Sequence, residues 1–98
     1  VDENDNILAT TYEGRYPPDH LRNAIRFRDG TCRYPGCTKK AQNCDLDHRE
    51  PLPDGATNGD NLWALCRHHH KLKTFKHAEP IRLGGRWVWR IRATTLRE

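Results

Sequence analysis

The chain has 98 residues, of which 35% are hydrophobic and 31% are charged. This length favours one domain with a small core, and such domains often need a metal ion or disulfides for stability. No apolar run approaches the ~18 residues needed to span a membrane, and no secretion signal is recognisable. We therefore expect a cytoplasmic protein without a membrane partner. Because the chain contains no Met, we also expect it to be part of a longer protein.

The net charge of +4 is distributed unevenly along the chain. Residues 1–20 carry five acidic side chains against Arg15, whereas residues 21–98 carry sixteen Lys and Arg against eight acidic side chains. A basic region of this kind suits a polyanion such as DNA. A solvated surface rich in Lys and Arg gives the same count, so charge alone leaves both interpretations open.

The first predicted element is a helix that follows a polar segment. Residues 1–16 are expected to be an acidic lead-in from a missing N-terminal region. The helix should begin at residues 17–18, because Pro is tolerated in a first turn, and end at Gly30. Its apolar residues have the i, i+3, i+4 spacing of one helix face. They are Leu21, Ala24 and Ile25. Arg22 and Arg26 share the opposite face, where either DNA or water could meet them.

Short strands and turns are predicted after this helix. Residues 44–48 have the alternating character of a short strand, and residues 62–65 form an apolar run that suits a second strand. Between them, residues 50–60 contain Pro-Asp-Gly and Asn-Gly-Asp sequences that are typical of an exposed loop. A short basic helix is expected over residues 68–76. Residues 81–91 alternate around a Gly-Gly pair, which predicts a β-hairpin.

The spacing of Cys and His predicts a metal site. Cys32 and Cys37 form a C-x4-C pair around a Pro-Gly turn, and Cys66 and His69 form a C-x2-H pair. Two such pairs can build a tetrahedral Zn²⁺ site with no open position, which would be structural and would stabilise a small core. Two disulfides are the alternative for four Cys. The neighbouring His and the absence of a secretion signal favour a metal in a reducing compartment.

Cys44 complicates this assignment, because it could replace Cys37 or His69 as a ligand. It lies in a predicted strand and lacks the Pro-Gly turn that lets a chain segment wrap an ion. We therefore interpret Cys44 as a small buried hydrophobic residue. The remaining alternative is that some of the other Cys are also buried thiols without a metal.

A second group of polar residues consists of Asp47, His48, Asn61 and His70. Consecutive helical residues point ~100° apart, so His70 should face a different site from His69. An Asp and a His that converge from two elements suit a divalent ion with open positions. His48 points to the other face of the strand and, as a neutral imidazole near pH 7, could take a proton from water. Each residue alone has an ordinary structural interpretation, and only their joint spacing favours catalysis.

This spacing resembles that of the HNH endonuclease family, in particular the C-terminal HNH domain of actinobacterial proteins of the 13E12-repeat type. The three letters of the motif fall on His48, Asn61 and His70, within the segments DHREP, GDNL and CRHHHKLKT. The matching stretch runs from Cys32 to Thr74. Many members have Cys at the position of His69, and both residue types bind Zn²⁺.

The resemblance implies an α+β fold of the ββα-metal type, in which two strands and a helix surround a catalytic ion. The structural zinc site would brace it, and a flanking helix and a C-terminal β-hairpin would complete it. The HNH nuclease domain would span residues 17–80 and the hairpin extension residues 81–98. Nothing in the resemblance covers residues 1–15 or the chain beyond residue 80.

The resemblance also implies a metal-dependent DNA endonuclease that hydrolyses phosphodiester bonds. Asp47 and His70 would hold Mg²⁺, Mn²⁺ or a similar divalent ion, and His48 would activate the attacking water. Asn61 would fasten the loop and hold the His48 backbone. Four basic residues near the motif are available for contacts to DNA phosphates. They are Arg49, Arg67, Lys71 and Lys73.

Two other functions fit parts of the pattern. A zinc-stabilised nucleic-acid-binding module without catalysis would share the zinc site and the basic charge, but it would not need the second polar group. A zinc-braced protein-interaction domain could use the three Trp as contacts. They are Trp63, Trp87 and Trp89, and ordinary core packing is the simpler interpretation for them. His68 has no assigned role beyond contact with solvent or phosphate.

Overall fold

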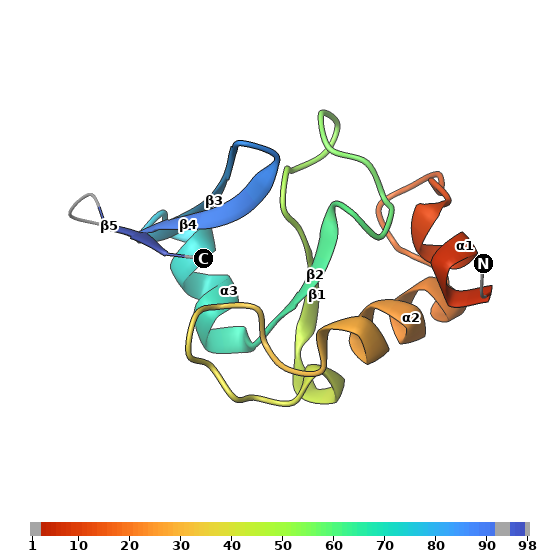
Figure 1. The fold of residues 1–98 in the computed structure, drawn as a ribbon, viewed down its shortest axis with the longest axis horizontal. Coiled ribbons are helices and arrows are strands. Elements are labelled where there is room, and N and C mark those ends of the chain that lie inside the picture. The colour runs from red at the N-terminus through yellow and green to blue at the C-terminus, as the bar shows by residue number, and fades with distance from the viewer. Residues whose placement is uncertain (1–2, 92–94, 98) are drawn as a thin grey trace.

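Two antiparallel sheets and three α-helices organise the chain in a computed structural model, which describes residues 3–91 and 95–97 (Figure 1). The first sheet consists of β1 (Asp45–His48) and β2 (Leu62–Leu65), and α3 (Arg67–Thr74) follows β2 directly. The protein is thus a small mixed α/β domain, as expected from the sequence. Both strands of the first sheet lie at the predicted positions, and α3 corresponds to the predicted basic helix.

The register of the first sheet determines which side chains lie together. Asp45 is opposite Leu65, and His48 is opposite Leu62. All four residues of β2 are buried, whereas β1 is only partly buried. Because alternate residues of a strand share a face, Asp45 and Asp47 lie on one side of β1 and His48 lies on the other.

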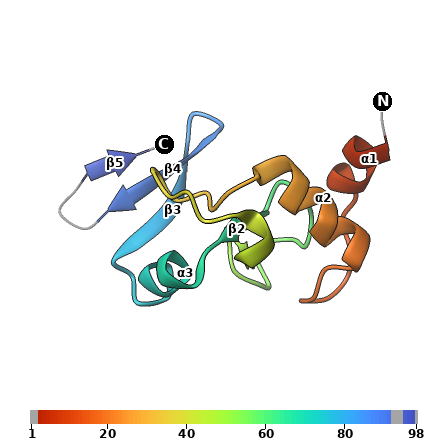
Figure 2. The same ribbon diagram turned by 90° about the horizontal axis from the view of Figure 1, so that it is seen from below.

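The predicted first helix is α2 (Asp19–Asp29), which ends at Gly30 with a φ of 70°. Its predicted apolar face is confirmed by burial of Leu21, Ala24 and Ile25. The last turn is attached to β2, because the Asp29 carboxylate accepts the Ala64 N–H at 2.9 Å. The helix therefore covers the sheet on the side opposite α3 (Figure 2).

The N-terminal segment contains a helix that the sequence did not predict, α1 (Glu3–Ala9). Its Ile7 and Leu8 pack against the core residues of α2 and β2. The Leu8 carbonyl also accepts the Gly59 N–H at 3.0 Å, so the segment touches the loop before β2. A Cβ atom at Gly59 would lie 2.6 Å from that carbonyl oxygen, which explains why the position is Gly. The lead-in is therefore packed against the domain, and residues 1–2 lie outside the described residues.

The second sheet has the strand order β3 (Ala78–Leu83), β4 (Arg86–Ile91) and β5 (Thr95–Arg97). The predicted hairpin is confirmed, with a two-residue turn at Gly84-Gly85, where both φ angles are positive. It begins earlier than predicted, because β3 pairs with β4 from Ala78 onwards. Parts of the predicted extension, residues 92–94 and 98, lie outside the described residues.

Most of the buried residues form two clusters, both of which include residues of β2. One contains Leu21, Ile25 and Leu62. The other joins the cysteines to the second sheet through Trp63 and Trp89, whose rings stack 4.9 Å apart. Over the described residues, each helix is too short or too polar to cross a bilayer.

Candidate functional site

The four predicted zinc ligands come together in the structure. Ligand atoms of Cys32, Cys37, Cys66 and His69 all lie within 4.8 Å of one another. The Cys66 Sγ is 3.1 Å from His69 Nδ1, and the Cys32 Sγ is 3.6 Å from the same atom. Ligands of one tetrahedral Zn²⁺ at ordinary bond lengths are about 3.4–3.8 Å apart. The cluster could therefore hold a metal such as zinc.

Local backbone structure presents these ligands. The Cys37 N–H donates to the Tyr34 carbonyl at 3.1 Å, which closes the Pro-Gly turn. Cys66 precedes the first residue of α3, so His69 follows within the first turn, and the Cys66 N–H donates to the Cys32 Sγ at 3.3 Å. The Tyr34 ring stacks on the His69 ring at 4.0 Å with an interplanar angle of 3°. This stacking fixes the orientation of the imidazole.

The pKa values of the cluster residues are shifted in different directions. Burial raises the pKa of the Cys32 thiol to about 12. Burial also lowers the pKa of His69, which favours the neutral imidazole that metals bind. At Cys66 burial acts to raise the pKa, but hydrogen bonds from the His69 backbone and from neighbouring thiols outweigh it, so the pKa is lowered. A bound metal ion would displace the remaining thiol protons, and metal binding is thereby coupled to pH.

Cys44 is not part of this cluster. It is buried, as predicted, among the core residues near the two cysteine pairs. Its Sγ lies 3.3 Å from the Lys40 carbonyl, and burial raises the pKa of its thiol. Cys44 therefore has the surroundings of a packed thiol.

The side chain of His70 lies between two carboxylates of β1. Its Nδ1 is 3.0 Å from Asp45 Oδ2, and its Nε2 is 3.3 Å from Asp47 Oδ1. The predicted convergence of Asp47 and His70 is therefore present. Asp45 was not among the predicted site residues. Its spacing of two residues from Asp47 nevertheless places both side chains on the same face of a strand. The hydrogen bond from His70 lowers the pKa of the Asp45 carboxyl group.

Asp47 is held by two further donors. It is only 7% exposed. Its Oδ2 accepts a hydrogen bond from Trp63 Nε1 at 3.0 Å and forms an ion pair with Lys73 Nζ at 2.9 Å. The Lys73 ammonium also donates to the His48 carbonyl at 2.8 Å. Lys73 was predicted to contact DNA phosphates, but here it points inward and joins α3 to β1.

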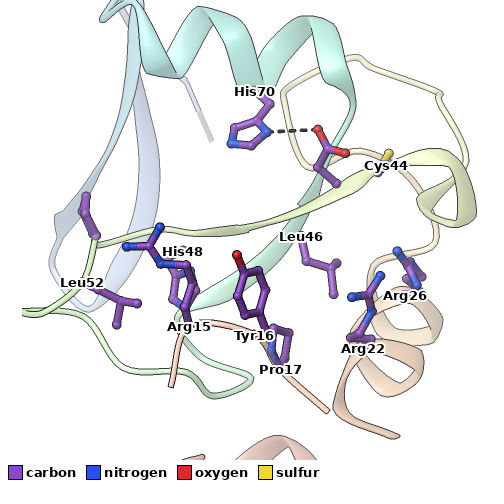
Figure 3. A pocket seen from close by; sticks show the side chains of 12 residues that line it. Arg15, Tyr16, Pro17, Arg22, Arg26, Cys44, Leu46, His48, Leu52 and His70 are labelled. Atoms are coloured by element: carbon purple, nitrogen blue, oxygen red, sulfur yellow. Dashed lines mark hydrogen bonds and ion pairs between the residues drawn. The ribbon is translucent and has the colours of Figure 1, made fainter. Parts of the chain in front are cut away.

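His48 lies on the other side of β1 from His70 (Figure 3). Its Nε2 is 3.0 Å from Thr57 Oγ1, and the Thr57 hydroxyl donates to the Gly14 carbonyl at 2.5 Å. Because the only hydroxyl proton is used in that bond, Oγ1 must accept the His48 Nε2–H, and Nδ1 carries the lone pair. Burial lowers the pKa of His48, which favours the neutral ring. His48 can therefore act as a proton acceptor through Nδ1.

Asn61 fastens the loop that follows His48. Its Nδ2 donates to the carbonyls of Glu50 and Ala56, both at 2.9 Å, and its Oδ1 accepts the Glu50 N–H at 2.9 Å. The Asn61 carbonyl also accepts the Arg49 N–H at 2.6 Å. These bonds agree with the expected loop-fastening role.

We expect Asn61→Ala to destabilise the protein by about 1–3 kcal/mol for each buried backbone group that loses its partner. Urea unfolding of metal-loaded protein measures this loss. Asn43→Ala is the matched control, because Asn43 is exposed and no side-chain hydrogen bond is found for it in the described structure. Equal stability of the two variants would contradict the role of Asn61.

His48 and His70 both line one cavity of about 580 Å³ (Figure 3). Three arginines also line it, and Arg15 among them was not considered a site residue from the sequence. The other two, Arg22 and Arg26, lie on the polar face of α2, for which the sequence allows contact with either DNA or water. Arg15 reaches this place because Tyr12 and Thr57 form a β-bridge that folds the segment back over the loop.

The remaining predicted phosphate contacts occupy two different environments. Arg49 is half-buried, and its guanidinium lies 4.4 Å from the Trp63 ring centroid. Burial lowers the pKa of Arg49 to about 10. Arg67 and Lys71 are exposed on α3, and Arg67 Nε is 3.2 Å from Asp45 Oδ2. Only Arg67 and Lys71 of the four are thus placed at the surface.

The tryptophans mainly build the core. Trp63 and Trp89 are buried, as packing predicted, and Trp87 is half-buried. The Trp87 ring lies under the Arg49 and Arg82 guanidinium groups, at 5.3 Å and 5.1 Å. This arrangement gives little support to an interaction surface made of three exposed tryptophans.

Comparison with known proteins finds relatives in Mycobacterium tuberculosis. The chain is 51% identical over 59 residues to uncharacterized protein Rv3776 of strain H37Rv, a match that covers 60% of the chain and 11% of the relative. Uncharacterized protein MT2160 of strain CDC 1551 and uncharacterized protein Rv2100 of strain H37Rv match with the same identity and coverage. The chain thus spans about 11% of the length of these relatives. No family model matches the chain, and no solved structure is significantly similar to it.

Proposed function

We propose that this domain is a metal-dependent DNA endonuclease of the HNH type. The observation that carries the proposal is that Asp47 and His70 meet on one face of β1, while His48 ends β1 and Asn61 directly precedes β2. The order β1, β2, α3 is also the order that a ββα-metal fold requires. The uneven positive charge of the chain agrees with a DNA substrate.

In this proposal, Cys32, Cys37, Cys66 and His69 hold a structural Zn²⁺. Four protein ligands leave no position for water or substrate. The contribution of this site is therefore to stability, and a different site must carry the chemistry.

Asp47 and His70 would hold the catalytic Mg²⁺, Mn²⁺ or similar ion. Asp47 Oδ1 and His70 Nε2 are 3.3 Å apart, near the separation of about 3 Å between adjacent ligands of one divalent ion. Such an ion would stabilise the charge on the phosphate as a Lewis acid. Lys73 Nζ contacts the same carboxylate at 2.9 Å. When an ion binds, the Lys73 ammonium must either share the Asp47 carboxylate with the ion or move away from it.

His48 would accept the proton of the attacking water at Nδ1. Thr57 holds the opposite nitrogen, Nε2, and thereby selects the tautomer and directs the ring. Asn61 would keep the backbone after His48 in place through its bonds to Glu50. Each residue of the motif thus has a distinct role in the proposed reaction.

Nicking of supercoiled plasmid DNA with a panel of divalent ions tests the function. We expect Asp47→Ala and His70→Ala each to lower metal-activated cleavage at least about tenfold, since even changes to residues that only orient metal ligands cost that much. Zinc content should remain near one ion per chain. His68→Ala is the matched control, because His68 is exposed on the same helix. Undiminished cleavage by protein that contains only the structural zinc would refute the scheme with two ions.

A second candidate function is a zinc-stabilised nucleic-acid-binding module without catalysis. The ion pair between Lys73 and the buried Asp47 favours it, since this pair can be purely structural. The same plasmid assay separates the two functions. Binding of DNA without cleavage in any of the ions would favour the module.

A further inference from the structure

The cavity beside His48 has a wall of three arginines. Arg15 comes from the segment between α1 and α2, and Arg22 and Arg26 are one turn apart on α2. Figure 3 shows Arg15 beside His48, with the two α2 arginines farther along the same cavity. Within residues 3–91, we find no ion pair or hydrogen bond that engages any of the three guanidinium groups.

The charge of this wall is not neutralised within the cavity. Asp45 is the one acidic residue among the described lining residues, and its carboxylate already contacts His70 and Arg67. Arg22 and Arg26 also repel each other, because like charges at i and i+4 on a helix are destabilising. Three uncompensated cations around one cavity favour an anionic ligand.

The side chain of Arg26 is not fully satisfied within the described structure. Its Nε is buried and has no hydrogen-bond partner. Buried donors without partners are uncommon in folded proteins, because each costs about 1–3 kcal/mol. Because the Nε has almost no accessible surface, a ligand could supply this partner only after the Arg26 side chain reorients toward the cavity.

The chemistry of the wall selects phosphate. Guanidinium groups bind phosphate oxygens with paired N–H donors, and arginine is favoured wherever such recognition is needed. The cavity also has apolar lining from Leu46 and Leu52, and its size of about 580 Å³ exceeds that needed for a free ion. A nucleotide unit, with its sugar and base beside the phosphate, matches both properties.

We propose that Arg15, Arg22 and Arg26 form a phosphate-binding subsite that positions one DNA strand against His48. The identity of the strand as DNA rests on the proposed function, whereas the phosphate subsite rests on the cavity itself. The subsite also gives a role to the N-terminal segment, which brings Arg15 to the cavity.

Methyl NMR of the zinc-loaded protein tests the subsite without any cleavage. Inorganic phosphate, and separately a short single-stranded oligonucleotide, should shift the signals of Leu46 and Leu52. The triple variant with Arg15→Gln, Arg22→Gln and Arg26→Gln should lose these shifts. Its salt dependence of oligonucleotide binding should also become shallower, by about one unit of slope for each arginine that contacts a phosphate. Zinc content and the remaining methyl signals report whether the variant is folded.

Two further variants sharpen the test. Lysine at the same three positions keeps the charge and should partly restore phosphate binding. The control removes three exposed lysines that do not line this cavity, Lys39→Gln, Lys40→Gln and Lys76→Gln, and should leave the Leu46 and Leu52 shifts intact. Unchanged shifts in the arginine variant, or their loss in the lysine control, would overturn the proposal.

The outcomes also separate the subsite from the enzyme. Arginine-dependent oligonucleotide binding without cleavage would refute the proposed nuclease activity and support the phosphate subsite. Normal cleavage and oligonucleotide binding by the triple Arg→Gln variant would refute the phosphate subsite and leave the proposed nuclease activity in place. Phosphate binding that an oligonucleotide does not displace would mean a small-anion site and would overturn the placement of a DNA strand.

Discussion

Cys66→Ser should lose the bound zinc and much of the folded structure. Cys66 lies where β2 meets α3, and its Sγ contacts both Cys37 and His69. Structural Zn²⁺ contributes about 10–16 kcal/mol of binding free energy in small zinc domains, which is comparable to the whole stability of a domain at about 5–15 kcal/mol. The cysteines also belong to the larger core, so loss of the ion would loosen the packing around Trp63.

Metal analysis and circular dichroism of the same purified variant measure this effect. Cys44→Ser is the matched control, because Cys44 is equally buried but lies outside the ligand cluster. The serine hydroxyl can donate to the Lys40 carbonyl, which lies near the present Sγ. Loss of zinc in Cys44→Ser together with its retention in Cys66→Ser would overturn the ligand assignment.

Features set by local chemistry were predictable from the sequence. The apolar face of α2 follows from helical spacing, and the hairpin of β3 and β4 follows from the Gly84-Gly85 turn. The cluster of Cys32, Cys37, Cys66 and His69, which could hold a metal ion, follows from two ligand pairs that are each closed by a short turn. In each case the signal lies within a few residues, and long-range packing is not needed to read it.

Features set by tertiary contacts were not predictable in this way. Helix α1 is short and polar, and helices of its length depend on packing for their stability, here of Ile7 and Leu8 on the core. The position of Arg15 depends on the β-bridge between Tyr12 and Thr57, which no local sequence pattern predicts.

The inward position of Lys73 was readable in principle. It lies three residues after His70, and residues at that spacing share a helix face. The assignment of Lys73 to DNA rested on its charge alone, whereas Asp47 is the partner that this face offers. Asp45 illustrates the same lesson on a strand, because its spacing from Asp47 places both carboxylates beside one histidine.

The largest expected effect on activity is that of His48→Ala. General bases contribute about 10²–10⁴-fold to rate, so this variant should cleave DNA at least about a hundred times more slowly. Its affinity for DNA should change little, because affinity comes mainly from Lys and Arg contacts to phosphates. Zinc should also stay bound, since His48 is not among the cluster ligands.

Thr57 supplies a second test of the same role. Thr57→Val removes the hydroxyl that accepts the His48 Nε2–H but keeps the side-chain shape, so the ring would lose its fixed tautomer. We expect a loss of cleavage of about 10–100-fold, as is typical for removal of an orienting partner. Thr57→Ser retains the hydroxyl and should restore most of the activity, which a purely structural role of the Thr57 methyl group would not allow.

The informative measurement for both positions is cleavage rate against DNA affinity in the same purified protein. The proposed role of His48 is proton transfer through Nδ1, whereas DNA affinity comes mainly from Lys and Arg contacts to phosphates. Loss of this ring should therefore lower the cleavage rate without lowering the DNA affinity. Nearly normal cleavage by His48→Ala would end the catalytic assignment of His48. Parallel losses of cleavage and binding would instead mean that His48 contacts DNA, and the module without catalysis would become the better description of the domain.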